Sequence, residues 1–418
     1  APGDDLQVHI QRDDANTAAG MNVRPATNGV NVLKLKDSWD YLRVYKSASS
    51  SNINGNTTFT DVLWDTSDEV DTGSFGFTPT SGNITLKGDA DDHFLVTTNV
   101  RLQRTTSNTR ENYEMVLTLD GVEIPGTRVT AYVRGASNGD NDFNDALVYT
   151  GLIRKDTVGD QTLNVEVRRE SSGSGGTTVI MADQTALTAV ALPDEASYIM
   201  LRESGTAAVA STRTAIDFDT QDEVDSYSFA QSTTTNPSRV EIDRAGDYLF
   251  FGTAYATGGV NNRQTFRADW RKNGSTVLPY GGTGAYYRGN SAFSAGASAA
   301  IIMNGLTASD YIELTQFDES AAPSDLTFQG NRVALQGIYL DQNLFGTDVV
   351  VSADGAQTAD ARLPNTDLYS GGSFVITEQS GSRSITSITL TENGTVDGST
   401  GLENIELYYD LDTSAPYD

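Results

Sequence analysis

Residues Trp64 to Phe75 read WDTSDEVDTGSF, and residues Phe218 to Phe229 read FDTQDEVDSYSF. The two stretches lie 218 − 64 = 154 residues apart, and three further blocks recur at that spacing. They pair Phe94-Leu95 with Tyr248-Leu249, 131–135 with 285–289, and Gly151-Leu152 with Gly305-Leu306. Matched blocks at one spacing predict a duplicated domain, because a unit of this length is too long for a solenoid repeat.

Each repeat is expected to consist of strands, because the chain is rich in Gly, Ser, Thr, Asn and Asp and lacks long helix-forming runs. In the first repeat, 38–194, strands are expected at 40–46, 61–64, 72–77, 83–87, 93–102, 112–119, 128–134, 146–153, 161–169 and 177–192. In the second, 195–342, they are expected at 197–203, 214–218, 226–230, 238–243, 247–256, 264–272, 284–288, 298–304, 310–316 and 327–340. Asp120-Gly121 and Asn273-Gly274 predict tight hairpins at equivalent places. Such units, all β and without helix, indicate two-sheet sandwiches.

The second repeat resembles the C1q/TNF-like jelly-roll family. RVEIDRAGDYLFFGTAYA (239–256) is similar to a strand pair of that family, RKNGSTVL (271–278) to its next hairpin, and NRVALQGIYL (331–340) to its closing strand. The DTxDEVD stretch resembles an early segment of bacterial C1q-like domains. The resemblance covers both repeats, and it implies ten-strand jelly rolls, a tendency to form trimers or pseudo-trimers, and binding rather than catalysis.

The N-terminal residues 1–37 resemble the end of a repeat. Residues 4–37 align without a gap on 161–194, an offset of 161 − 4 = 157. We expect an orphan pair of strands, because no earlier part of their own domain precedes them. Their apolar side chains are the predicted assembly residues: Leu6, Val8, Ile10, Val30, Val32, Leu33 and Leu35.

Residues 343–418 differ from the repeats and predict a small β-sandwich-like unit, short for a complete sandwich, with strands at 373–379, 382–392 and 402–412. Two arrangements would satisfy the backbone groups of the orphan strands. The strands are donated to this incomplete unit of the next subunit, or they pack against their own chain. We favour donation.

The amino-acid composition limits the kinds of partner that the chain is expected to bind. The net charge is −28 and the sequence pI is near 4.2, so nucleic-acid binding is not expected. The acidic surface suits a salty medium, and a merely solvated surface explains it equally well. The chain has no Cys and no apolar run long enough to span a bilayer. It begins with Ala, which is expected of a mature, processed chain.

One loop has the composition of a metal site. Asp140, Asp142, Asn144 and Asp145 bring oxygens together in NGDNDFND, which predicts a weak Ca²⁺ site, although a solvated acidic turn is the stronger alternative. The aligned loop of the second repeat, 292–299, carries no acid. The acids of both DTxDEVD stretches favour a structural role such as capping a turn, with a second cation site as the alternative.

Catalysis is not expected. His9 and His93 are the two histidines, and we expect both at the surface, away from any nucleophile motif or acid pair. Tyr132 with Arg134, and Tyr286 with Arg288, share strand faces and would stack at a subunit contact. The alternative that we favour places the tyrosines in a sheet face with the arginines reaching water.

We therefore predict a structural subunit of a self-assembling extracellular filament, pilus-like fibre or surface layer, joined head to tail by donated or shared strands. Orphan strands would be a liability in a free monomer, and a heterologous joint can grow without closing. The alternatives are a jelly-roll protein of a viral capsid, spike or fibre, and a secreted carbohydrate- or receptor-binding module.

Overall fold

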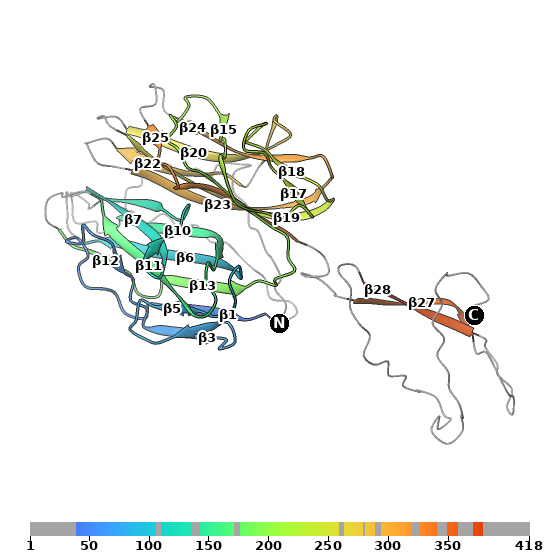
Figure 1. The fold of residues 1–418 in the computed structure, drawn as a ribbon. Coiled ribbons are helices and arrows are strands. Elements are labelled where there is room, and N and C mark those ends of the chain that lie inside the picture. Colours follow the sequence, from blue (N-terminus) through green and yellow to red (C-terminus); the bar gives the residue numbers. More distant parts are fainter. Residues whose placement is uncertain are drawn as a thin grey trace, which may run out of the picture. The chain divides into compact units, whose positions relative to one another are not determined.

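The computed structural model describes residues 39–105, 110–134, 143–170, 176–258, 263–278, 281–288, 294–319, 326–340, 349–357 and 371–378. Every regular element among them is a β-strand (Figure 1). The chain divides into two compact units, Ala1–Thr347 and Asp348–Asp418. The first unit contains both repeats. The predicted orphan strands, with Leu6, Val8, Ile10, Val30, Val32, Leu33 and Leu35, lie outside the described residues.

The first repeat is a sandwich of two antiparallel sheets. One sheet has the order β10 (Phe143–Arg154), β6 (His93–Arg104), β13 (Ala186–Ala191), β1 (Tyr41–Tyr45) and β3 (Thr66–Val70), with β12 (Thr178–Ile180) paired to β6. The other has the order β4 (Phe75–Phe77), β5 (Ile84–Leu86), β11 (Gln161–Arg169), β7 (Arg110–Leu119) and β8 (Val122–Glu123). Two further strands, β2 (Thr60–Asp61) and β9 (Val129–Arg134), pair with β11 and β7.

The second repeat has the same strand order. Its first sheet runs β23 (Ser294–Leu306), β19 (Gly246–Gly258), β26 (Val333–Tyr339), β14 (Tyr198–Glu203) and β16 (Thr220–Val224), with β25 (Leu326–Phe328) on β19. Its second runs β17 (Phe229–Ala230), β18 (Val240–Ile242), β24 (Tyr311–Asp318), β20 (Arg263–Lys272) and β21 (Thr276–Val277), with β15 (Thr214–Ala215) on β24 and β22 (Thr283–Arg288) on β20. The predicted duplication of one jelly-roll topology is therefore confirmed.

Each sandwich has its own apolar core. Side chains alternate between buried and more exposed along β6, as expected of a strand that covers a core with one face. Trp64 and Phe218, which begin the repeated stretch, are fully buried in the first and second core respectively. The repeated stretch therefore marks the same place in both sandwiches.

The acidic part of the repeated stretch forms strands that the sequence analysis missed. β3 and β16 lie at the ends of their sheets and pair with β1 and β14. Their side chains are largely polar, and the valine that ends each strand, Val70 or Val224, packs against a core. Neither strand therefore shows apolar alternation. The predicted capping role is confirmed for the first acid of each stretch, Asp65 and Asp219. Asp65 accepts hydrogen bonds from the Ser47 and Ala48 amides, and Asp219 accepts one from the Ser204 amide.

Residues with positive φ form the predicted hairpin turns, and other residues with positive φ interrupt the closing strands. Asp120 and Gly121 have φ values of 49° and 78°, and Asn273 and Gly274 have 51° and 72°, the left-handed region that such turns require. The strands expected at 177–192 and 327–340 are each divided in two. Left-handed Asp183 and Asn331 lie at the divisions, where short polar side chains tolerate positive φ.

The second unit contains an antiparallel pair, β27 (Val349–Gln357) and β28 (Gly371–Glu378). β28 matches the strand expected at 373–379, whereas β27 was not expected. The strands predicted at 382–392 and 402–412 lie outside the described residues.

Candidate functional site at the contact between the repeats

A third apolar cluster joins the two sandwiches. Its buried members come from both repeats: Leu152, Leu192, Ala196, Tyr198, Leu249, Phe251, Ile338 and Leu340. The edge strand β10 of the first repeat lies against β23 and β19 of the second (Figure 1). Burying a large apolar side chain contributes about 1.5–3 kcal/mol, so this cluster stabilises the pair of repeats as one body.

The backbone of edge strand β10 is satisfied by side chains of the other repeat. The Gln336 amide accepts from Leu152 N at 2.7 Å and donates to Leu152 O at 2.9 Å, and Gln336 is only 5% exposed. Thr150 N donates to Ser298 Oγ at 3.3 Å, and this hydroxyl donates to Thr150 O at 3.1 Å. The unpaired groups of a sheet edge are thus covered inside the chain.

The contact is one-way. β10 of the first repeat meets β23, β19 and β26 of the second, and the face of β19 and β26 has a counterpart in the first repeat. The register places Arg43, Thr97 and Thr188 in the first repeat where the second has Met200, Phe251 and Gln336. Thr97 and Arg43 are exposed, whereas Phe251 and Gln336 are buried. The face that receives an edge in the second repeat is therefore polar in the first.

A buried polar cluster lies at one side of this contact. Glu114 of the first repeat is fully buried and binds Arg128 Nη1 at 3.1 Å and Arg168 Nε at 2.6 Å. From the second repeat, the Tyr255 hydroxyl and Ser294 Oγ donate to Glu114 Oε1. Burial opposes ionisation, but Arg128, Tyr255 and Arg168 together hold the pKa of Glu114 below its ordinary value.

A second polar group lies elsewhere along the contact. The His93 ring stacks on Tyr198 with centroids 3.9 Å apart, and His93 Nε2 lies 2.7 Å from Glu223 Oε2. Arg154 Nη1 donates to Asp222 O at 3.2 Å. The expectation that His93 lies at the surface is wrong, because the second repeat covers it and leaves it 5% exposed. Glu223 of the second repeated stretch thus binds the first repeat through its carboxylate, and Asp222 binds it through its backbone carbonyl.

The sequence contained one signal for this contact. Along β19, the residues from Tyr248 to Ala256 are all buried, whereas its counterpart β6 alternates. A strand covered on both faces lacks alternation, so the run YLFFGTAYA indicates a second covered face. The partners Glu114, Ser294 and Gln336 gave no such signal, because each is a single polar residue in a strand.

The predicted calcium loop is described only in part. Asp140 and Asp142 lie outside the described residues, and Asn144 and Asp145 belong to β10. The Asp145 carboxylate accepts from Tyr132 N at 2.9 Å and Ala146 N at 2.8 Å, and its burial raises its pKa. Within the described residues, no group of three His, Asp or Glu side chains is placed to hold a metal ion. Calcium binding stays a prediction.

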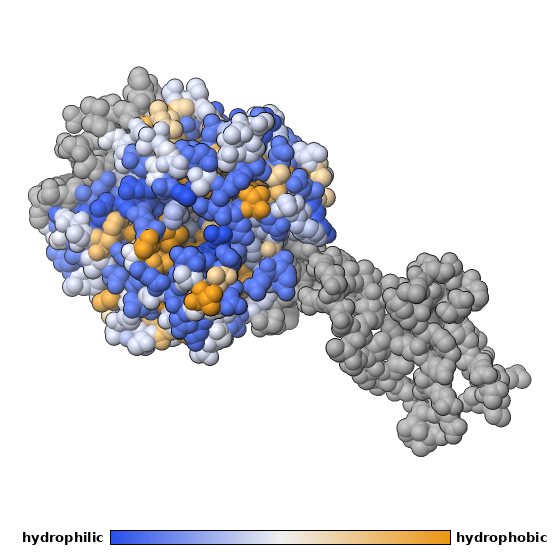
Figure 2. All heavy atoms as spheres, viewed as in Figure 1, coloured by the Kyte–Doolittle hydropathy of each residue, from blue (hydrophilic) through white to orange (hydrophobic). Residues whose placement is uncertain are grey.

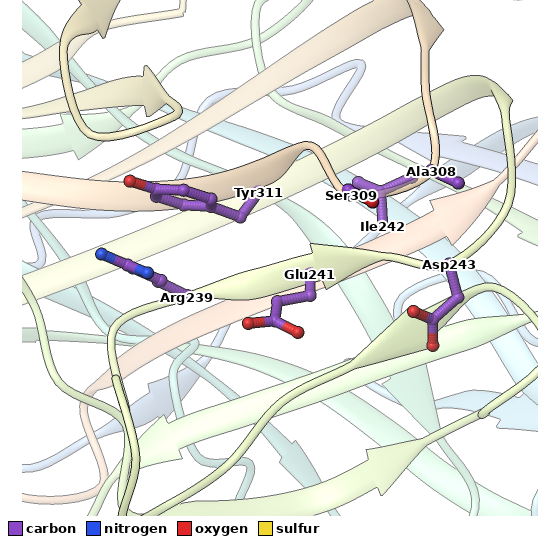
Figure 3. A pocket seen from close by; sticks show the side chains of 7 residues that line it. All are labelled: Arg239, Glu241, Ile242, Asp243, Ala308, Ser309 and Tyr311. Atoms are coloured by element: carbon purple, nitrogen blue, oxygen red, sulfur yellow. The ribbon is translucent and has the colours of Figure 1, made fainter.

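A shallow surface pocket of the second repeat offers little chemistry. It is lined by Arg239, Glu241, Ile242, Asp243, Ala308, Ser309 and Tyr311 (Figure 3). The Arg239 guanidinium lies 4.2 Å from the centroid of the Tyr311 ring. The two side chains therefore contact each other at one end of the pocket. On the face drawn in Figure 2, hydrophobic patches are small and separated by hydrophilic surface. Scattered patches of this kind are ordinary on a folded protein.

None of the described segments is a helix that is long and apolar enough to span a membrane. No protein-family model matches the chain, and no curated protein matches it. Among solved structures, murine APRIL at pH 8.0 is 12% identical, covers 37% of this chain and 100% of its own, and has a TM-score of 0.25. Eiger TNF from S. frugiperda covers 41% of this chain and 99% of its own, with 12% identity and a TM-score of 0.23. The jelly-roll assignment rests on the strand order of the two repeats.

Proposed function

We propose that this chain is a non-catalytic structural subunit of a self-assembling extracellular filament, pilus-like fibre or surface layer, whose copies join head to tail through shared β-strands. The observation that supports it is the one-way contact between the repeats. An edge strand of one jelly roll is covered by a different surface of the next one.

A contact between two different surfaces is heterologous, so it leaves an unused counterpart of each surface on the pair. The first repeat retains the face that carries Arg43 and Thr97. The second retains the C-terminal end of β23, around Asn304, whereas the N-terminal part of β23 already binds the first repeat through Ser294, Gly296 and Ser298. The retained face carries Arg43, Thr97 and Thr188 instead of an apolar set, so it cannot repeat the same contact. The joint between copies therefore uses other parts of the chain.

The N-terminal segment supplies this joint in our proposal. Its seven apolar assembly residues, Leu6 to Leu35 as given above, align on the closing strands of the first repeat. Donated to residues 343–418 of the next copy, these strands would add ladder hydrogen bonds and an apolar stripe to an incomplete unit. Such a joint would dissociate slowly and can extend without closing.

The test deletes residues 1–36. The truncated chain is expected to stay folded in both repeats and to remain monomeric by light scattering, with no filament or lattice in electron micrographs. A matched pair of full-length variants sharpens the result: Leu6→Asp with Ile10→Asp is expected to block assembly, and Gln7→Ser with Gln11→Ser is expected to permit it. Normal assembly of the truncated chain, or closed icosahedral particles, would contradict the proposal.

A further inference from the structure

Two carboxyl groups of the first repeat share one serine of the second. Ser294 Oγ donates to Glu114 Oε1 at 3.2 Å, and Ser294 N donates to Glu170 Oε2 at 2.9 Å. Asn112 donates one hydrogen bond to Glu170 Oε2 and another to Ser294 O at 3.1 Å. Separating the repeats would break the bonds to Ser294 and expose both carboxyl groups.

The two carboxyl groups have different surroundings. Glu114 faces two cations, Arg128 and Arg168, and the Tyr255 hydroxyl. Glu170 is held by neutral donors, the Asn112 amide and the Ser294 backbone. Arg169, the residue before Glu170, is paired with another acid: its Nε lies 4.0 Å from Glu111 Oε2. The cations therefore favour a charge on Glu114, and that charge opposes a second one on Glu170.

These different surroundings shift the pKa values of Glu114 and Glu170 in opposite directions. Burial, and then the charge of Glu114, raise the pKa of Glu170 to about 7. A carboxyl group whose pKa is higher in the closed contact than in an open one binds its proton more tightly when closed. The resulting stabilisation is fully present below the ordinary pKa of 4.5 and is lost as the pH rises through about 7.

We infer that one proton on Glu170 controls the contact between the repeats, which closes tightly when the proton is bound and loosens when it leaves. This inference goes beyond the assembly proposed above, because it concerns a contact within one chain. It makes the rigidity of the pair, and so the geometry that it presents to other copies, responsive to mildly acidic conditions.

The test follows hydrogen exchange of amides at the contact, Ser294, Gly296 and Leu152, in the full chain between pH 5 and 7.5. After correction for the intrinsic pH dependence of exchange, their protection is expected to fall by up to about 100-fold as the pH rises. Amides in the core of each repeat should change much less. In Glu170→Gln, which mimics the neutral carboxyl, protection at the contact should stay nearly constant.

Other ionisable side chains lie near this contact, including His93, so the difference in protection between the variant and the native chain is the informative quantity. Glu166→Gln is the matched control, because Glu166 lies on β11, which ends just before Glu170, and binds Thr118 of its own repeat. It should keep the native profile. Identical profiles for Glu170→Gln and the native chain would overturn the inference. So would a carbon-13 titration of the native Glu170 carboxyl with its midpoint near 4.5.

Discussion

The rings of Tyr132 and Tyr286 touch edge to face across the contact between the repeats, with centroids 5.3 Å apart and planes at 65°. The residues are equivalent, since 286 − 132 = 154 is the spacing of the duplication. Equivalent positions of two bodies related by rotation lie close together only beside the rotation axis. Leu152 and Gln336 are not equivalent, and they meet in one direction only. The repeats are therefore arranged about an axis near the tyrosines, as neighbours in a ring or helix are.

Removing this ring contact is expected to loosen the pair. Tyr132→Ala and Tyr286→Ala should show a coupling energy of about 0.5–1.5 kcal/mol in a double-mutant cycle, because edge-to-face rings interact beyond their buried area. The measurement is denaturant unfolding of the native chain, both single variants and the double variant. Additive effects would mean that the rings are neighbours without interacting.

A glycine at the contact tests how closely the repeats approach. At Gly126 a β-carbon would lie 2.3 Å from Ala334 Cβ of the other repeat, whereas at Gly121 nothing lies within 4 Å. Both glycines have positive φ, 75° and 78°, so both alanine variants carry similar backbone strain. Gly126→Ala should lower the melting temperature more than Gly121→Ala and increase hydrogen exchange at Leu152. Equal effects would contradict the close contact.

Gln336→Leu is expected to destabilise the chain by about 1–3 kcal/mol for each Leu152 backbone group left unpaired. The side chain keeps a similar size, so the loss comes from the two hydrogen bonds. Gln329→Leu is the control, because Gln329 Nε2 binds Thr257 Oγ1 within the second repeat at 2.6 Å. Urea unfolding measures both. A smaller cost for Gln336→Leu than for Gln329→Leu would count against the bridging role.

Glu114→Gln is expected to cost about 1.5–3 kcal/mol at pH 7, because Arg128 loses one of its two carboxylate partners and keeps only Glu123. The pKa of Glu114 is lowered in the folded chain, so its stabilisation is present above the ordinary 4.5 and is lost as the pH falls through the folded value. The difference in unfolding free energy between the variant and the native chain should therefore shrink in acid. A difference that is independent of pH would contradict the charge pairing.

The predicted binding of Ca²⁺ can be tested in the full chain. If residues 138–145 bind Ca²⁺, a chelator should lower the melting temperature of the native chain, and Asp142→Ala should abolish this response. Asp160→Ala, at an exposed position after β10, should leave the response intact. The absence of any chelator effect would identify the segment as an ordinary acidic turn.

The sequence by itself determined the duplication, the all-β class and the hairpins. The duplication follows from blocks repeated at one spacing. The class and the hairpins follow from local rules: apolar residues alternate where one face of a strand is covered, and Asp-Gly and Asn-Gly adopt the left-handed turn conformation. The same rules missed β3 and β16, since an acidic edge strand shows no alternation. The same rules also predicted continuous closing strands across Asp183 and Asn331, where the positive φ of each residue interrupts the strand.

Only the tertiary structure decided how the repeats meet. Alternation shows that a face is covered, but it does not show what covers it, and the contact combines Leu152, Gln336, Glu114 and Ser294 from distant parts of the chain. The burial of His93 and the raised pKa of Glu170 follow from that packing, because burial and neighbouring charge depend on what surrounds a side chain in space. A polar residue in a strand looks the same in sequence whether water or another domain lies beside it.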